Sequence, residues 1–277
     1  MKTMLYAAVL FFAMTCMVIN CGVDTEDDGN AIDGFEWIRA GAFMMGSPFE
    51  EPGREGNENP HRVILSKGFY MGKYAVTEEQ FAAVDLSIPV AGSLPKVSVS
   101  WNEIIMFCNT LSIKDGLSPA YRVKGSTDPA EWGSFTAAEV MIITNANGYR
   151  LPTEAQWEYA CRAGTTTAYS FGNTITPDLA NYFAMYGNVR LPVDSFSPNA
   201  WGLYNMHGNV WEVVWDLYRD GSSYVEENID PMGETGGTWH LLRGGSWEGA
   251  ARQVRSASRL AWNPPGGNIG FRLARLK

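Results

Sequence analysis

The sequence predicts an α+β fold that is irregular and rich in loops, for three reasons. Its 29 glycines indicate many tight turns, because glycine adopts backbone conformations that other residues avoid. A hydrophobic fraction of 45% with 13% aromatic residues is enough for a core. Patterns typical of helix starts occur in three places, and short apolar runs typical of strands flank them. Since no repeat or composition break follows residue 33, we expect one domain over residues 34–277.

The first residues are typical of an export signal. Lys2 is followed by an uncharged, mostly apolar run that reaches Ile19. Cys21 and an acidic stretch come next, and this arrangement resembles a bacterial lipoprotein signal, in which the cysteine carries the lipid. We therefore expect a signal peptide over residues 1–20, lipidation at Cys21 and a flexible acidic tether over residues 21–33. Cys16 is a rival lipidation position, and an ordinary signal peptide is the simpler alternative.

The domain itself is expected to begin with strands. Residues 35–38 and 41–47 are short apolar runs with glycine between them, and residues 50–59 are charged and glycine-rich, as in a surface loop. Residues 63–70 predict a further strand, whose β character we expect to continue to Thr77. Beyond Gly164 the chain is dense in Gly, Trp, Asn and Pro, which predicts short strands joined by long ordered loops.

Three helices are predicted by the same local signal, a hydroxyl residue followed three positions later by Glu or Gln. Each member of such a pair can cap an exposed backbone amide of the first helical turn. The pairs are Thr77 with Gln80, Ser100 with Glu103, and Thr153 with Gln156. The second helix has an apolar face at helical spacing, made by Ile104, Phe107, Cys108 and Leu111.

Charge and cysteine content exclude some classes of protein. The net charge of −9 and the pI near 4.9 argue against a nucleic-acid partner, which needs a concentrated basic face. After Cys21 only Cys108 and Cys161 remain. These two could form a disulfide, or they could be two buried thiols on helices.

The last stretch, residues 242–277, is rigid at both ends and irregular in the middle. It opens with Arg-Gly-Gly-Ser-Trp at residues 243–247 and closes with Asn-Ile-Gly-Phe-Arg-Leu at residues 268–273. Between these blocks, charged residues, small residues and Trp262 follow no single secondary-structure period. A segment that is fixed at its ends and irregular between them is a natural binding surface.

Several blocks together resemble the formylglycine-generating enzyme family, also called sulfatase-modifying-factor domains. The blocks follow in order at residues 41–47, 60–63, 148–160, 199–206, 208–212, 243–247 and 269–272. The resemblance covers nearly all of residues 35–275. It implies an elaborated C-type-lectin-like fold with a twisted antiparallel core, flanking helices and much irregular structure.

The resemblance also permits a test of the family's chemistry. Its oxygen-using members hold copper with two cysteine thiolates just after the Gly-Gly-Ser block, and here those positions fall at about Gly249 and Val254. We therefore expect no copper oxidase and no enzyme. An iron site would need the isolated His61, His207 and His240 to cluster. Ser246 lacks the pattern of an activated nucleophile.

Calcium fits the resemblance better than iron does. Members of this fold often fix their loops through oxygen ligands near the block at residues 208–212. Asn209 and Glu212 could be ligands; alternatively, Asn209 stabilises a turn and Glu212 pairs with an arginine. Both readings stay open at this point.

The end of the chain further resembles the variable proteins of diversity-generating retroelements, a group that diversifies one surface of the lectin-like scaffold. The matching parts are residues 243–247, 254–257 and 269–273, together with Arg259. The resemblance implies a variable region over residues 243–273, in which Arg255 and Arg259 brace the segment. The residues between the motifs would bind the ligand: Glu248, Gly249, Ala250, Arg252, Gln253, Ser258, Leu260, Ala261, Trp262 and Gly267. We expect Trp262 to be exposed, since Asn-Pro-Pro follows it, and to anchor a partner together with Arg252.

The predicted function is therefore that of a lipoprotein on the outer-membrane surface of a bacterium. It would bind a protein ligand through its diversified C-terminal region and would catalyse no reaction. Two alternatives remain: a metal-dependent oxidase of the same family with a relocated site, and an accessory or structural lipoprotein.

Overall fold

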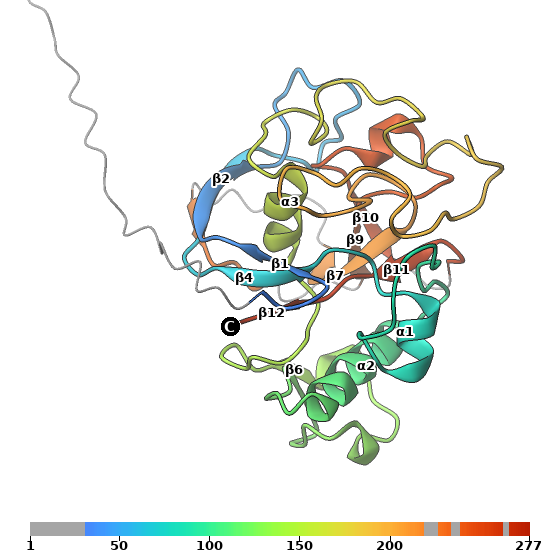
Figure 1. Ribbon diagram of the computed structural model, residues 1–277. Helices are drawn as coiled ribbons and strands as arrows, with labels where there is room; N and C mark the ends of the chain where they lie inside the picture. Colours follow the sequence, from blue (N-terminus) through green and yellow to red (C-terminus); the bar gives the residue numbers. More distant parts are fainter. Residues whose placement is uncertain (1–30, 219–226, 234–238, 263–265) are drawn as a thin grey trace, which may run out of the picture.

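The computed structural model describes residues 31–218, 227–233, 239–262 and 266–277 (Figure 1). The predicted signal peptide, Cys16, Cys21 and most of the predicted tether lie outside these residues. The strands are β1 (Phe35–Ile38), β2 (Gly41–Met45), β3 (His61–Leu65), β4 (Phe69–Gly72), β5 (Tyr121–Val123), β6 (Val140–Ile142), β7 (Trp211–Tyr218), β8 (Glu227–Ile229), β9 (Trp239–Arg243), β10 (Arg259–Trp262), β11 (Ile269–Phe271) and β12 (Ala274–Arg275). The helices are α1 (Glu78–Ala83), α2 (Trp101–Lys114) and α3 (Glu154–Arg162), with short 3₁₀ turns η1 (Pro129–Glu131), η2 (Ala137–Glu139) and η3 (Ala251–Val254).

The mixed, loop-rich α+β fold is confirmed, and its three α-helices begin where the sequence predicted. At each start the hydroxyl of Thr77, Ser100 or Thr153 accepts a hydrogen bond from the backbone of the residue three positions later, whose side chain bonds back. These reciprocal bonds satisfy amides that the first helical turn leaves free.

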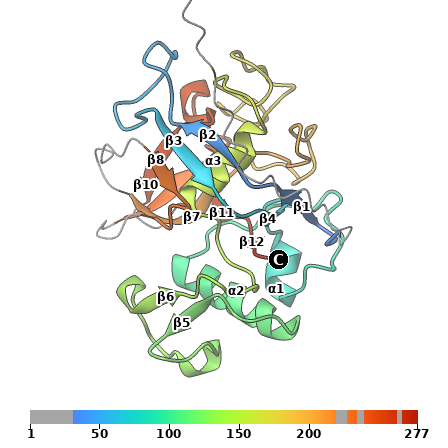
Figure 2. The same ribbon diagram turned by 90° about the vertical axis from the view of Figure 1, so that its left-hand side faces the viewer.

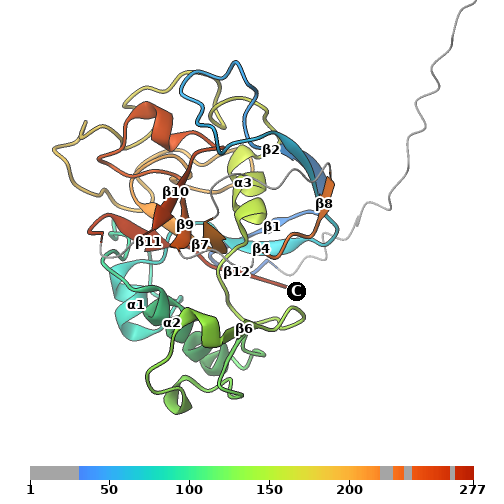
Figure 3. The ribbon, with the colours of Figure 1, turned by 180° about the vertical axis from the view of Figure 1, so that it is seen from behind.

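The strands form small sheets, mostly with antiparallel neighbours. Their orders are β10-β9-β7-β11, β1-β4-β12, β2-β3-β8 and β5-β6. Two pairs are parallel, β11 with β7 and β3 with β8, which the expected antiparallel core did not include. Figure 3 shows α3 between the sheet that contains β9 and β7 and the sheet that contains β2 and β8.

One predicted strand is corrected by the structure. Residues 63–77 do not form a continuous strand, because the chain turns at residues 66–68 and places β3 and β4 in different sheets. Asp230 accepts a hydrogen bond from the backbone of Ser66 at 2.7 Å, and a Cβ on Gly68 would lie 2.3 Å from the ring of Trp37. The turn therefore depends on contacts with distant residues.

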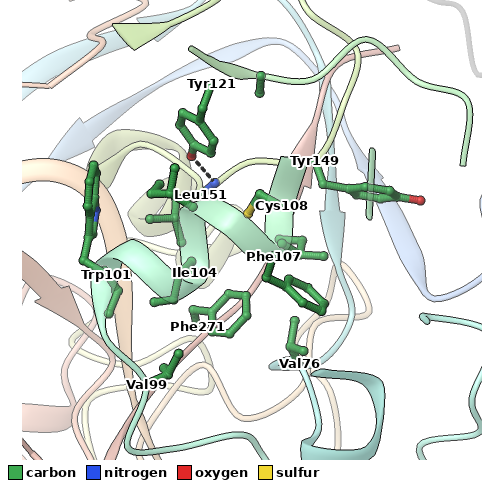
Figure 4. Close-up of a cluster of buried hydrophobic side chains, with 14 of the residues drawn as sticks. Val76, Val99, Trp101, Ile104, Phe107, Cys108, Tyr121, Tyr149, Leu151 and Phe271 are labelled. Carbon is green, nitrogen blue, oxygen red and sulfur yellow. Dashed lines mark hydrogen bonds between the residues drawn. The ribbon is translucent and has the colours of Figure 1, made fainter. Parts of the chain in front are cut away.

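The hydrophobic core has two main parts. One surrounds α2, where Ile104, Phe107 and Cys108 pack with Phe271 of β11 (Figure 4). The other surrounds α3, whose Trp157 and Cys161 are buried together with residues from β1, β3 and β9. Figure 2 shows α1, α2, β5 and β6 grouped at one end of the molecule. The end of the chain contributes to both parts of the core, with Phe271 in the first and Ala274 in the second.

Two smaller observations complete the fold. Cys108 and Cys161 are free, buried thiols on α2 and α3, so that reading of the two cysteines is confirmed and the disulfide is excluded. Burial raises the pKa of Cys161 to about 12. Within the described part of the chain, no helix is both long enough and apolar enough to span a bilayer.

Candidate functional site

The C-terminal segment, residues 243–273, runs from the end of β9 through η3 and β10 to β11. Gly244 and Gly245 lie at its start with φ of +88° and +76°, a region that favours glycine. A Cβ on Gly245 would lie 2.4 Å from the side chain of Val254. The two glycines therefore allow the chain to turn and to pack directly against η3.

Arg243 fixes the middle of the segment to its start. Its buried guanidinium donates to the carbonyl oxygens of Ser256, at 3.0 Å, and Ala257, at 2.8 Å. The same group is paired with Glu158 of α3. Because a guanidinium presents donors in a fixed plane, one side chain sets the position of several backbone groups.

Arg255 fixes η3 to the loop between β2 and β3. It donates to both carboxylate oxygens of Glu58, at 2.6 and 2.8 Å, and also pairs with Glu51. Arg255 and Glu58 are both almost fully buried. A buried two-point pair of this kind defines orientation as well as distance.

Arg259 and Arg272 make equivalent pairs at the far end of the segment. Arg259 donates to both oxygens of Glu154, each at 2.8 Å. Arg272 donates to both oxygens of Glu212, at 2.6 and 2.7 Å. The sequence-based expectation that Arg255 and Arg259 brace the segment is confirmed. We call these four arginines and their glutamates the arginine frame.

A further carboxyl group, that of Asp216, lies beside the frame. It accepts a hydrogen bond from the backbone of Glu154 at 2.7 Å and is buried. Burial, followed by the nearby charge of Glu154, raises the pKa of Asp216 to about 7. Arg259 opposes this shift.

The predicted ligand-binding residues are divided by the structure into three groups. Glu248, Arg252, Leu260 and Gly267 are exposed, whereas Ala250, Gln253 and Ala261 are partly exposed. Gly249, Ser258 and Trp262 are buried. The first two groups are the residues of the predicted set that a ligand can reach.

The expected exposure of Trp262 is wrong. Its side chain is 3% exposed, and its ring lies 6.0 Å from that of His240, its partner in the β10–β9 register. Trp101 of α2 stacks on the same histidine at 4.5 Å. The following Asn-Pro-Pro suggested a surface loop, but β9 and α2 cover this side chain. Residues 263–265 lie outside the described part of the chain.

Gly249 and Val254 stand where the family resemblance implied copper-binding cysteines, and the structure shows the surroundings of both. Gly249 is hydrogen-bonded through its backbone to Ser246 and Phe183. Val254 is buried in a small cluster with Tyr169 and Tyr182. Neither residue has a side chain that can bind a metal.

The three histidines lie in separate surroundings. His207 is buried, accepts a hydrogen bond from the backbone of Ser170 through Nε2, and therefore donates from Nδ1 to the carbonyl of Val254, at 2.8 Å. Burial lowers the pKa of His207 to about 4. His61 is on β3 and His240 on β9. Among the described residues, no group of three or more His, Cys, Asp or Glu is arranged to hold a metal ion.

The two residues considered for calcium have protein partners. Asn209, at a φ of 68°, accepts hydrogen bonds from Leu191 and Asn181 and so stabilises a turn. Glu212 is bonded by Arg272 and by the indole of Trp157, at 2.7 Å. Asn209 therefore stabilises a turn and Glu212 pairs with an arginine, as the alternative to calcium binding stated.

Two features of this region were missed in the sequence. Glu58, Glu154 and Glu158 of the frame were not identified, although Glu154, Glu158 and Arg162 recur at i, i+4 spacing on one helix and could have been recognised as one charged face. The contact of residues 183–184 with residues 247–249 was also missed. No local sequence pattern predicts that contact, because the two stretches are far apart in the chain.

Comparison with known proteins places the chain in a family. Residues 23–277 match the sulfatase-modifying factor enzyme 1-like domain, and the chain belongs to that family. Its structure resembles Treponema denticola variable protein 1, with 30% identity and a TM-score of 0.75 over 88% of this chain and 95% of that one. The expected resemblance to a variable protein is thus confirmed.

Relatives of similar identity have names that describe different functions. The formylglycine-generating enzyme of Mus musculus is 30% identical over 86% of this chain and 73% of its own. A chaperone protein, LppX, of Paenibacillus barcinonensis is 29% identical over 97% of this chain and 99% of its own. The family is therefore shown, but these names alone do not decide between a binding protein and an enzyme.

Proposed function

We propose that the chain is an outer-membrane surface lipoprotein that binds a protein ligand through the exposed residues of its C-terminal segment and catalyses no reaction. The observation that carries this proposal is the division of the segment. Arg243, Arg255 and Arg272 are buried and Arg259 is nearly so, and together they hold the backbone, while Glu248, Arg252, Leu260 and Gly267 between them are exposed. A surface that is to vary must not contribute the contacts that fold the protein, and here the arginine frame contributes them.

The exposed residues are suited to recognition rather than to chemistry. Arg252 has an exposed guanidinium, 3.9 Å from an oxygen of Glu55, which is also exposed, and a partner can displace so weak a surface pair. On β10, Leu260 is exposed and Ala261 is partly exposed, so both add apolar area that a partner can reach. The lack of a metal-binding side chain at Gly249 and Val254 supports the same proposal.

Binding is tested with a surface variant that leaves the frame intact. We expect the chain with Glu248→Ala, Arg252→Ala and Leu260→Ala to lose a partner that the unchanged chain retains in quantitative pull-downs of surface proteins. The matched control is Met141→Ala, which changes an exposed side chain of β6 at the other end of the molecule. An unchanged set of partners would contradict the proposal.

An enzyme on the same fold is the rival, and the 30% identity to a mouse formylglycine-generating enzyme favours it. Elemental analysis of the purified chain separates the two. Stoichiometric copper or iron would support the enzyme. The lipid anchor has its own check, because Cys21→Ser should abolish metabolic lipid labelling and Cys16→Ser should not.

A further inference from the structure

A loop next to the C-terminal segment exposes an unusual number of large apolar side chains. Within residues 177–189, Phe183 is 62% exposed, Val189 51% and Met185 47%. Leu179 and Tyr186 are exposed as well. Single exposed apolar residues are common, but several in one short stretch mark a surface that contacts another molecule.

This exposure belongs to an ordered loop. The side chain of Asn181 donates to the carbonyl of Val189 at 2.9 Å and so closes the loop. The hydroxyl of Tyr186 donates to the carbonyl of Pro177, and the backbone of Asn209 donates to the carbonyl of Asn181 at 2.8 Å. These bonds hold the apolar side chains away from the core.

The same loop is bonded directly to the candidate ligand-binding segment. The backbone amide of Phe183 donates to the carbonyl of Gly249 at 2.8 Å, and that of Ala184 donates to the carbonyl of Trp247 at 2.7 Å. Glu248, an exposed residue of the segment, lies between the two acceptors. Phe183 and Ala184 have φ of 52° and 54°, a left-handed conformation that residues other than glycine adopt rarely. In Figure 1 the loop is yellow and lies near the red helical turn of residues 251–254.

The charge of the loop indicates what it fits. Asp178 is the only charged residue between residues 163 and 189, and Arg190, which follows directly, is paired with Glu78 at 2.7 Å. A surface that binds anionic lipid headgroups needs basic residues around its apolar side chains. An uncharged apolar face of a protein has no such requirement.

We propose that Phe183, Met185 and Val189 form one continuous binding surface with Glu248 and Ala250, and that the loop part of this surface receives an apolar, uncharged area of the protein ligand. The inference rests on the proposed function and extends its site to a part of the chain outside the C-terminal segment. The segment supplies the changeable contacts, and the loop supplies a constant apolar area beside them. Its backbone bonds keep the two parts in a fixed relation.

The test uses a random peptide library displayed on phage as the probe. Peptides are selected on the purified chain, and the affinity of each is then measured for three variants. The loop variant carries Phe183→Ser and Met185→Ser, and the segment variant carries Glu248→Ala and Arg252→Ala. The control variant is Met141→Ser, an equally exposed apolar residue on β6. Circular dichroism establishes that each variant is folded.

We expect the selected peptides to combine apolar residues, which contact the loop, with polar residues, which contact Glu248 and Arg252. They should lose at least about tenfold in affinity for both the loop and the segment variants, as for central contacts of an interface. The control variant should bind as the unchanged chain does. Undiminished binding to the loop variant would overturn the inference. Loss with the segment variant alone would overturn it and leave the proposed function standing, whereas loss with the loop variant alone would contradict the proposed function.

The same variants test two other binding partners of the loop, a lipid surface and a second copy of the chain. Phospholipid vesicles that bind the unchanged chain but not the loop variant would show a lipid surface and overturn the inference. Sedimentation that detects a dimer of the unchanged chain but not of the loop variant would show a second copy, with the same consequence. We expect neither result.

Discussion

At the scale of single residues, buried charge is the recurring feature of this protein. The guanidinium groups of the frame are inaccessible or nearly so, and each meets a carboxylate from a distant part of the sequence. Asp216 differs, because its immediate charged neighbour is another carboxylate, Glu154. A buried aspartate in this position is more stable in its neutral form, which raises its pKa.

Asp216→Asn should therefore change the pH dependence of stability. The pKa of Asp216 is about 7 in the fold and 3.8 for an ordinary aspartate. Between these values the folded chain binds more protons than the unfolded chain, so the contribution of Asp216 to stability falls as pH rises. The free energy of unfolding of the asparagine variant, relative to that of the unchanged chain, should rise from about pH 4 to about pH 7 and then level off. Urea unfolding across this range measures it, and a constant difference would contradict the assignment.

At the scale of elements, α3 is the helix that positions most of the site. Its first turn begins at Thr153, whose hydroxyl accepts from the backbone of Gln156 at 3.2 Å, while the Gln156 side chain accepts from the backbone of Thr153 at 3.1 Å. The helix then presents Glu154 to Arg259 and Glu158 to Arg243. The helix start is thus coupled to two pairs of the frame.

Loss of this cap should lower the stability of the whole chain. We expect Thr153→Ala to reduce the free energy of unfolding by about 1 kcal/mol, the usual effect of removing a capping hydroxyl. Thr153→Ser retains the hydroxyl and should cost less than half as much. Urea unfolding of the two variants under one set of conditions gives the comparison. A serine variant as unstable as the alanine variant would show that the methyl group matters and the cap does not.

At the scale of the whole molecule, the end of the chain is joined to its beginning. Arg255 and Glu58 are 197 residues apart in the sequence, and Arg272 donates to the carbonyl of Gly72, 200 residues earlier, at 3.0 Å. β12 pairs with β4, and β11 lies parallel to β7. The candidate binding segment is therefore held by contacts from several earlier parts of the chain.

Two arginines three positions apart test this arrangement. Arg255→Gln should lower the free energy of unfolding by about 3–5 kcal/mol, because it leaves Glu51 and Glu58 buried without their cation. Arg252→Gln, at an exposed position, should change it by no more than about 0.5 kcal/mol. Thermal and urea unfolding of both variants measure the contrast. Similar losses in the two would mean that the segment is not divided into frame and surface.

The sequence by itself determined the features whose causes are local. The three helix starts depend on bonds between residues three positions apart. The two cysteines were placed on helices, but the choice between a disulfide and buried thiols stayed open until the structure showed both thiols free. The order of the motif blocks was enough to indicate the family and the bracing role of Arg255 and Arg259.

Only the tertiary structure decided which distant groups meet. It paired each arginine of the frame with its glutamate, divided residues 63–77 between two sheets, buried Trp262 beneath β9 and α2, and placed residues 183–184 against the C-terminal segment. The physical reason is one of range. A helix cap is complete within one turn of chain, whereas the exposure of a side chain and the partner of a buried charge depend on segments that return from up to about 200 residues away.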